Sequence, residues 1–150
     1  MVITKSGVTV MKINGYEFPN LPAPFTDEET VDIKHFIVGY IEAIFFTEDE
    51  EIGESGAGEL SYEAKHSIVN DCAAFYLANK QDLKAVSTDY TYHIGNTGED
   101  FWLTRNAHGV GFWSRGLGDE GRNLTDACGW GTDFAEKYVY RGDDNLIYIQ

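Results

Sequence analysis

The segment from Asp100 to Arg115, DFWLTRNAHGVGFWSR, constrains the fold of this chain more than any other stretch. Two runs in which apolar and polar residues alternate flank the tetrapeptide Asn-Ala-His-Gly, and asparagine and glycine favour tight turns. The pattern predicts a β-hairpin in which a two- or four-residue loop places Trp102 opposite Trp113 and Asp100 opposite Arg115. A three-residue loop would shift this register and separate the pairs. Because both faces carry large apolar side chains, we expect a central hairpin that is covered on both faces.

The composition is that of a folded, intracellular domain. The 150 residues are 43% hydrophobic and 14% aromatic, which supports a single domain over 1–150 and argues against disorder. The two cysteines, Cys72 and Cys128, lie in apolar helical contexts, so we expect buried free thiols and no structural zinc. The first ten residues, MVITKSGVTV, lack the apolar core of a signal peptide, and no run approaches a membrane span. These features favour a cytoplasmic protein.

The charge balance narrows the range of partners. The chain has 25 acidic and 11 basic residues, which gives a formal net charge of −14. Such a surface repels nucleic-acid phosphates and anionic membranes, so we expect no direct binding to either. Solubility is the commonest reason for an acidic surface. The alternative is a protein that engages a basic partner surface, including one that imitates nucleic acid.

Three helices and a second hairpin complete the predicted fold. A capping-box pattern predicts a helix over residues 26–46, a serine cap predicts another over 61–85, and a third is expected over 123–137. Residues 138–149 have the pattern of a C-terminal hairpin. The predicted class is therefore α+β, with an antiparallel sheet built on the 100–115 and 138–149 hairpins and about three helices packed on it.

Two segments are expected to lie outside these elements. Residues 1–25 predict short β structure with a turn at Asn14-Gly15, followed by an extended connector that holds all three prolines. Residues 47–60, TEDEEIGESGAGEL, predict an acidic, glycine-rich loop. Its carboxylates do not have the spacing of an EF-hand, so no metal site is assigned and a solvated loop is expected.

A longer pattern that includes the hairpin resembles a known group of proteins. The matching residues are DFWLTRN at 100–106, His108-Gly109, GFW at 111–113 and RGLG at 115–118, with YIEA at 40–43, Asp71-Cys72, Phe75 and VYRGDD at 139–144. From about residue 36 onward the chain is similar to small acidic proteins encoded by tailed bacteriophages. The resemblance implies a phage gene product of the host cytoplasm. It carries over no catalytic residue, because that group is itself uncharacterised.

The leading functional hypothesis is a non-enzymatic phage accessory protein that binds a host protein with a basic surface. An anti-restriction-like or other counter-defence role would fit this hypothesis. Tryptophan and arginine are favoured at binding hot spots. The candidate binding residues are Trp102, Thr104, Arg105, Asn106, His108, Trp113 and Arg115. The alternative is that both tryptophans belong to the core, because apolar residues flank them.

A small enzyme with a polar site at the hairpin tip is the second hypothesis. His108 could act as a general base, and Arg105 and Arg115, beside Asn106, could hold an anionic substrate. However, Arg105 projects from the face opposite to Thr104, and no triad or metal set can be assembled. No catalytic residue and no cofactor is therefore assigned.

The same residues also have structural explanations. His108 can be a turn residue, and Asp100 with Arg115 can form a cross-strand ion pair that closes the hairpin. A third functional class is a virion-associated structural protein that uses its aromatic surface in a symmetric oligomer.

Overall fold

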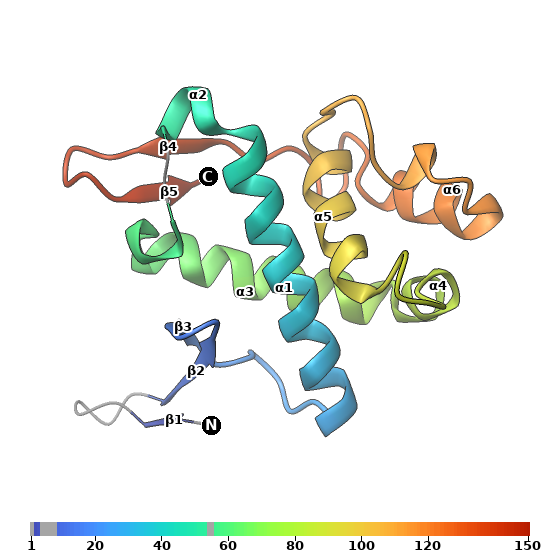
Figure 1. Cartoon of the computed structure of the whole chain (residues 1–150), viewed down its shortest axis with the longest axis horizontal. Helices are drawn as coiled ribbons and strands as arrows, with labels where there is room; N and C mark the ends of the chain where they lie inside the picture. Colours follow the sequence, from blue (N-terminus) through green and yellow to red (C-terminus); the bar gives the residue numbers. More distant parts are fainter. Residues whose placement is uncertain (1, 4–8, 54–55) are drawn as a thin grey trace.

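The computed structural model describes residues 2–3, 9–53 and 56–150, and within them the fold is mainly helical (Figure 1). The α-helices are α1 (Asp27–Thr47), α2 (Asp49–Ile52), α3 (Tyr62–Ala78), α4 (Lys80–Val86), α5 (Ile94–Arg105) and α6 (Gly118–Ala127). Two 3-10 turns are η1 (Ala57–Glu59) and η2 (Phe112–Ser114). The strands are β1 (Val2–Ile3), β2 (Thr9–Ile13), β3 (Tyr16–Pro19), β4 (Val139–Arg141) and β5 (Ile147–Ile149).

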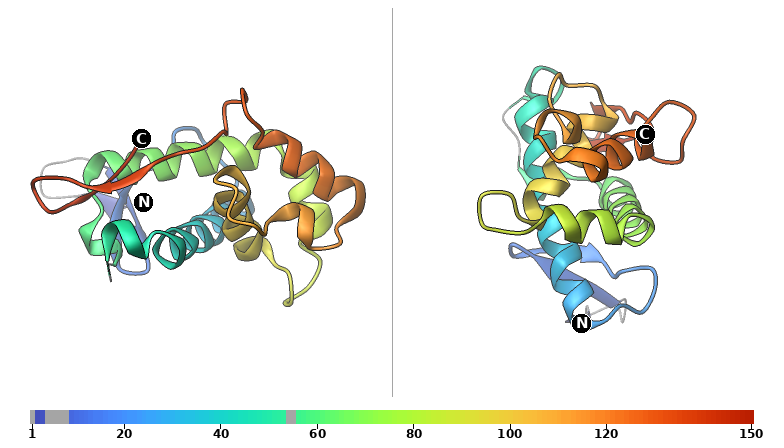
Figure 2. Two further views of the ribbon diagram at one scale, coloured as in Figure 1. Left: turned by 90° about the horizontal axis from the view of Figure 1, so that it is seen from above. Right: turned by 90° about the vertical axis from the view of Figure 1, so that its right-hand side faces the viewer.

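The predicted class α+β holds, but the predicted architecture is wrong. The strands form a small three-stranded sheet, β1-β2-β3, and a separate two-stranded sheet, β4-β5. Both lie at the same end of α3, while α4 and α6 pack together at the other end (Figure 1). Seen from above, α3 runs along one side of the molecule and α1 with α5 along the other (Figure 2). Helices therefore form the body of the molecule, and no central sheet joins the two small ones within the described residues.

The two short hairpins form where turn chemistry predicts them. Asn14 and Gly15, between β2 and β3, have φ values of 51° and 85°, the positive pair that a tight type I′ turn requires. In the C-terminal hairpin, β4 pairs antiparallel with β5, with Val139 opposite Ile149, so the prediction over 138–149 is confirmed. The segment 47–60 is partly ordered as α2 and η1, so the prediction of a plain loop is only partly right for its described residues.

Helix α1 begins at the predicted capping box. The Thr26 hydroxyl accepts a hydrogen bond from the Glu29 amide at 3.1 Å, and the Glu29 carboxylate accepts one from the Thr26 amide at 2.9 Å. The two contacts satisfy amide groups that the first helical turn cannot pair internally. The prediction of a helix over 26–46 is therefore confirmed to within a residue at each end.

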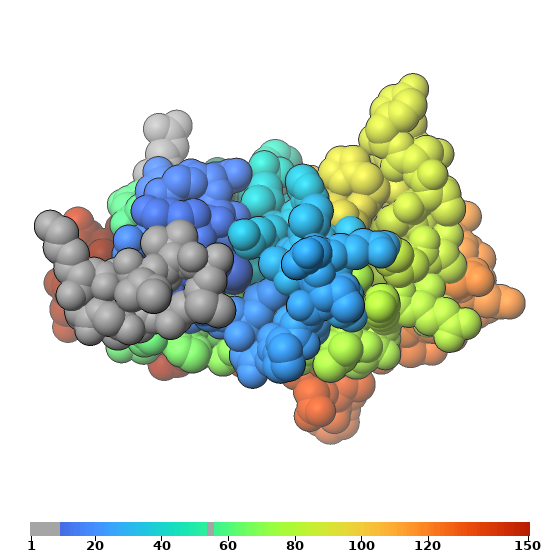
Figure 3. Space-filling view, turned by 90° about the horizontal axis from the view of Figure 1, so that it is seen from below, coloured from blue at the N-terminus to red at the C-terminus, as the bar shows by residue number. Residues whose placement is uncertain are grey.

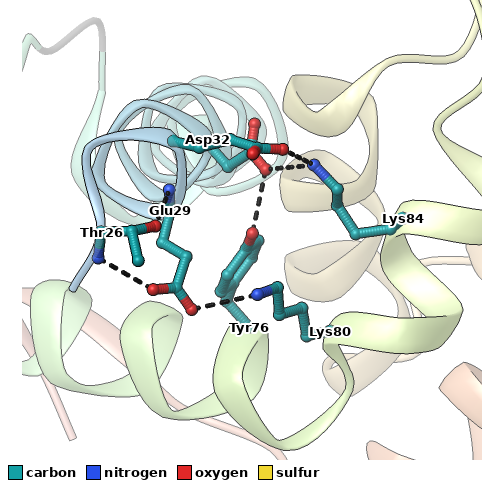
Figure 4. A network of polar contacts seen from close by, with 7 residues as sticks. Thr26, Glu29, Asp32, Tyr76, Lys80 and Lys84 are labelled. Carbon is teal, nitrogen blue, oxygen red and sulfur yellow. Dashed lines mark hydrogen bonds and ion pairs between the residues drawn. The ribbon is translucent and has the colours of Figure 1, made fainter.

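A polar network fixes the start of α1 against the end of α3 and α4 (Figure 4). The Tyr76 hydroxyl donates to Asp32 at 2.9 Å, and Lys84 lies 3.0 Å from the same carboxylate. Lys80 forms a further ion pair with Glu29 at 3.2 Å. Because the lysines are well exposed, these ion pairs add little to the free energy of unfolding. Their main effect is to set how the helices lie against one another.

The helix predicted over 61–85 forms as two helices. Ser61 caps α3 as expected, with its hydroxyl accepting from the Ala64 amide at 3.0 Å. At Asn79 the backbone leaves helical geometry, and the side-chain amide of this residue donates to the Phe75 carbonyl. Asparagine competes for backbone partners in this way, which explains the break between α3 and α4.

The predicted hairpin over 100–115 is wrong, because its first half is the end of helix α5. His93 caps this helix: its Nδ1 accepts from the Gly95 amide, and Asn96 accepts in return from the His93 amide. From Gly98 onward the buried residues include Phe101, Trp102 and Arg105, which recur at helical spacing. The alternation of apolar and polar residues from Asp100 to Arg105 therefore arises from the buried and exposed faces of helix α5, and not from a strand. The second half of the segment is a loop that contains η2.

Glycines let α5 approach α1 very closely. A Cβ atom on Gly39 would lie 1.8 Å from the Gly95 carbonyl oxygen, and one on Gly98 would lie 2.0 Å from the Phe36 carbonyl oxygen. Only residues without a side chain fit at both points, so the two helices are in backbone contact.

The helix predicted over 123–137 is also displaced. The observed helix is α6, which begins at Gly118 and ends at Ala127. Beyond it, Gly131 has a φ of 84°, and the Thr132 hydroxyl donates to the Gly129 carbonyl at 2.7 Å. Both features favour turns over helix, so the chain loops outward at this point.

Aromatic side chains from the long helices fill the core. The rings of Phe75 in α3 and Phe101 in α5 stack with 4.0 Å between their centroids, and Phe36 of α1 packs against both. Phe134, beyond α6, meets Phe75 edge-on at 5.1 Å. The core therefore joins α1, α3 and α5 to the segment that follows α6.

Two segments project from this body. Seen from below, the surface comprises β2–β3, the first turns of α1 and the α4 region (Figure 3). The segment between α4 and α5 and the segment after α6 extend beyond it (Figure 3). In the described parts of the chain, no helix combines the length and apolar character needed to cross a membrane.

Candidate functional site

The loop after α5 separates two hollows on the surface. Residues 107, 109 and 113 line the first hollow, whereas residues 108, 110 and 115 line the second. We call the first, of about 880 Å³, the aromatic hollow, and the second, of about 570 Å³, the acidic hollow. The predicted strand alternation does not hold in this loop, because Trp113 and Arg115, two positions apart, line different hollows.

Exposed aromatic rings surround the aromatic hollow, which is lined by Trp113, Trp130 and Tyr138. These residues are 58%, 100% and 69% exposed. Side chains of this size are usually at least half covered in a folded domain, so their joint exposure at one hollow marks a candidate contact surface. Cys128 and Glu136 also line the hollow, and Glu136 is its one acidic residue.

Arg105 lines the same hollow but is held from within the protein. Its residue is only 3% exposed. Its Nη1 donates to Asp71 at 2.8 Å and to the Tyr40 hydroxyl at 2.9 Å, and its Nε donates to the Ala135 carbonyl at 3.0 Å. Burial tends to lower the pKa of Arg105, but its interactions with Tyr40 and Asp71 outweigh burial and raise the pKa. Arg105 is therefore a permanently charged tie between α1, α3, α5 and the C-terminal segment.

One atom of this tie has no hydrogen-bond partner. The Nη2 of Arg105 is buried and unpaired among the described residues. The guanidinium also lies over the Phe101 ring, with its central carbon 4.7 Å from the ring centroid, which offsets part of the cost of burying the charge. Because Asp71 neutralises the charge, Arg105 leaves little attraction for an anionic ligand.

The acidic hollow lies between α1, α5 and the loop. Its polar lining includes Glu42, Glu99, His108 and Arg115. Its apolar wall is formed by Ala43, Phe46, Leu103 and Val110, and Phe46 is 84% exposed. Burial raises the pKa of Glu99, and the neighbouring Glu42 charge acts in the same direction.

A buried carboxylate supports the arginine of this hollow. Asp100 is fully buried and accepts from Arg115 Nη2 at 2.9 Å and from Arg115 Nε at 3.1 Å. The Tyr92 hydroxyl donates to the same carboxylate at 2.6 Å, and burial raises the pKa of that hydroxyl. The predicted Asp100–Arg115 ion pair is therefore confirmed, but it joins α5 to the end of η2 and not two strands.

The remaining predicted polar residues hold the loop in place. The Thr104 hydroxyl accepts from the Phe112 amide at 3.1 Å. Asn106 donates to the Trp102 carbonyl and accepts from the Lys137 amide at 3.0 Å. These contacts tie the loop to α5 and to the segment that leads into β4.

His108 is exposed, as is Arg115 among the predicted catalytic candidates. Its Nε2 lies 3.3 Å from the Glu48 carboxylate. His108 lines the acidic hollow and also a third hollow of about 400 Å³, which includes Asn106. Arg105, Asn106, His108 and Arg115 therefore do not converge: Arg105 lies at one hollow, and the other three are divided between two more.

The two predicted tryptophan anchors have opposite environments. Trp102 is fully buried, and its indole nitrogen donates to the Thr47 hydroxyl at 2.9 Å, so it belongs to the core. Trp113 is exposed at the aromatic hollow. Sequence reasoning missed Trp130 and Tyr138, which lie in stretches predicted as helix and strand. The available signal was a tryptophan between two glycines, Gly129 and Gly131, a context typical of an exposed turn.

Comparisons with known proteins give no family for the chain: no family model, curated protein or solved structure matches it. The described residues also contain no group of three histidine, cysteine, aspartate or glutamate side chains placed to hold a metal ion. The two hollows are therefore the candidate sites for a ligand or a partner.

Proposed function

We propose that this protein is a non-enzymatic accessory protein that binds a basic surface on another protein. In keeping with its resemblance to small acidic phage proteins, we place it in the cytoplasm of a bacterial host with a counter-defence role. The observation that carries the proposal is the gathering of Trp113, Trp130 and Tyr138 at one hollow of a chain with a net charge of −14.

The exposed aromatic rings and the net negative charge contribute to binding in different ways. Large aromatic side chains at a hollow supply the contact area and the desolvated centre that dominate binding energy. An excess of carboxylates speeds the encounter with a basic surface and suppresses acidic partners. The expected interface is therefore an aromatic centre inside an acidic periphery.

The enzyme alternative is weaker on electrostatic grounds. It requires two arginines to attract an anionic substrate, but Arg105 is paired with Asp71 and Arg115 with Asp100. The acidic hollow adds two further carboxylates and no unpaired arginine or lysine. This environment disfavours an anionic substrate, so we do not propose catalysis at His108.

Capture from a bacterial lysate tests the proposal. The purified protein is immobilised, and proteins retained at low ionic strength are compared with those retained at about 0.5 M salt, where the Debye length falls to about 4 Å. Trp130→Ser is the test variant. Tyr90→Ser is the matched control, because Tyr90 is 89% exposed and lies outside both hollows.

The proposal predicts a basic protein that wild type and Tyr90→Ser retain at low salt and that Trp130→Ser retains less. The captured protein, once purified, should bind directly with an affinity that falls as salt rises. The proposal would be refuted if no protein is retained at any salt concentration. It would also be refuted if the amount retained changes neither with salt nor on substitution of Trp130.

A further inference from the structure

We propose that the aromatic hollow is a receiving site for an arginine side chain on the basic partner. The guanidinium would stack against the exposed rings of Trp113 and Trp130 and pair with Glu136. This inference rests on the proposed function and adds the chemistry by which the partner is recognised.

The charges at the hollow favour a cation. Two charged residues line it, Arg105 and Glu136. Arg105 is buried and neutralised by Asp71, whereas Glu136 is exposed and takes part in no ion pair among the described residues. The one uncompensated charge available to a ligand is therefore negative.

The rings favour the same kind of ligand. Indole and phenol faces carry negative electrostatic potential and attract cations that lie over them. None of the ring–ring contacts in the described part of the chain joins Trp113, Trp130 or Tyr138, so the rings do not cover one another. Their faces remain open around a hollow of about 880 Å³, which has room for a guanidinium together with its methylene stem.

Arginine suits this site better than lysine. Its guanidinium is planar, more weakly hydrated than an ammonium and able to stack on an aromatic face while its edge pairs with a carboxylate. A lysine ammonium would use the charge of Glu136 but would gain less from the two indoles. A purely apolar group would use the rings and leave Glu136 without a partner.

The protein itself offers an internal reference for a test. It has three tryptophans: Trp113 and Trp130 line the hollow, whereas Trp102 is buried and its indole nitrogen donates to Thr47. In a ¹H–¹⁵N spectrum each indole gives its own signal. A short peptide of alternating arginine and glycine is titrated into the full-length protein, and an equally charged lysine–glycine peptide is titrated in parallel.

The expected result is a saturable shift of the Trp113 and Trp130 signals, with the Trp102 signal unmoved and the arginine peptide binding at least about 3-fold more tightly than the lysine peptide. Trp130→Ala and Glu136→Gln should each weaken binding by about 3- to 10-fold. Glu50→Gln, which removes an exposed charge that lines neither hollow, should leave binding within about 1.5-fold.

Four outcomes would overturn the arginine site. They are equal binding of both peptides, no shift at Trp113 and Trp130, stronger shifts with a neutral aromatic probe such as indole, and self-association that covers the hollow in sedimentation experiments. Lysate capture separates this failure from failure of the proposed function. Salt-sensitive capture that Trp130→Ala weakens and Glu136→Gln leaves intact removes only the arginine site. A shift by the arginine peptide without capture of any protein removes the partner proposal.

Discussion

Substitution of Gly98 by alanine tests the close approach of α1 and α5, which places the loop and both hollows. The new Cβ would lie 2.0 Å from the Phe36 carbonyl oxygen, whereas real Cβ atoms essentially never come within 3.0 Å of such a neighbour. The difference between 3.0 and 2.0 Å means that the helices must separate by at least 1.0 Å. The obstacle is a backbone carbonyl within a helix, so it cannot rotate away as a side chain could.

The cost follows from two opposed effects. Forcing an extra carbon into a packed interior typically costs about 1–3 kcal/mol, and a clash with backbone belongs at the upper end. Alanine regains about 1 kcal/mol relative to glycine through its higher helix propensity. The net loss in the free energy of unfolding should be about 2 kcal/mol, which corresponds to a melting temperature lower by about 4–8 °C for a domain of this size.

Thermal and urea unfolding, followed by far-UV circular dichroism, measure this loss. Gly56→Ala is the control: its φ of −135° suits any residue, and a Cβ there meets nothing within 4 Å. That variant should stay within about 0.5 kcal/mol of wild type. If Gly98→Ala unfolds at the wild-type temperature or above it, the backbone contact between α1 and α5 is wrong, and so is the placement of the hollows derived from it.

Two further predictions concern titratable groups. Burial and the neighbouring Glu42 raise the pKa of Glu99. The folded state therefore holds the Glu99 proton to higher pH than the unfolded state, and it loses stability as pH rises above the unfolded pKa. In urea unfolding, Glu99→Gln should be more stable than wild type at pH 7, and the difference should vanish near pH 4. Burial raises the pKa of the Cys128 thiol to about 12 and that of Cys72 well above its usual value. Both thiols should therefore resist a thiol-specific reagent such as DTNB in native buffer at pH 8 and react fully in denaturant, and rapid native labelling at Cys128 would contradict its burial below the aromatic hollow.

Local chemistry was sufficient to predict the ends of elements. The capping box of Thr26 and Glu29, the Ser61 cap and the Asn14-Gly15 turn all form as expected. Each depends on contacts between residues no more than three positions apart, so the sequence specifies them without knowledge of the tertiary fold. The C-terminal hairpin is also local, because its paired strands are close in the sequence and a short turn joins them.

The error at residues 100–115 has the opposite origin. Glycine is a poor helix former, so Gly95 and Gly98 weaken the helical signal at the start of α5. In the structure those glycines are required by tertiary contact with α1, which outweighs their low intrinsic propensity. Without its first turns, the rest of the helix showed only the short alternating pattern that also fits a strand.

The candidate site illustrates why polar residues in a sequence are poor guides to function when taken alone. Asparagine, arginine and histidine side chains are suited to catalysis because they form several directed hydrogen bonds, and the same property suits them to fasten a loop. Asn106 joins α5 to the C-terminal segment, Arg105 joins four segments, and Arg115 closes on a buried aspartate. Burial and partner identity distinguish the two uses, and both depend on the tertiary fold. By contrast, Trp113 and Trp130 are exposed and stack on no other ring among the described residues. For that reason the binding proposal rests on them and not on the polar residues that hold the loop in position.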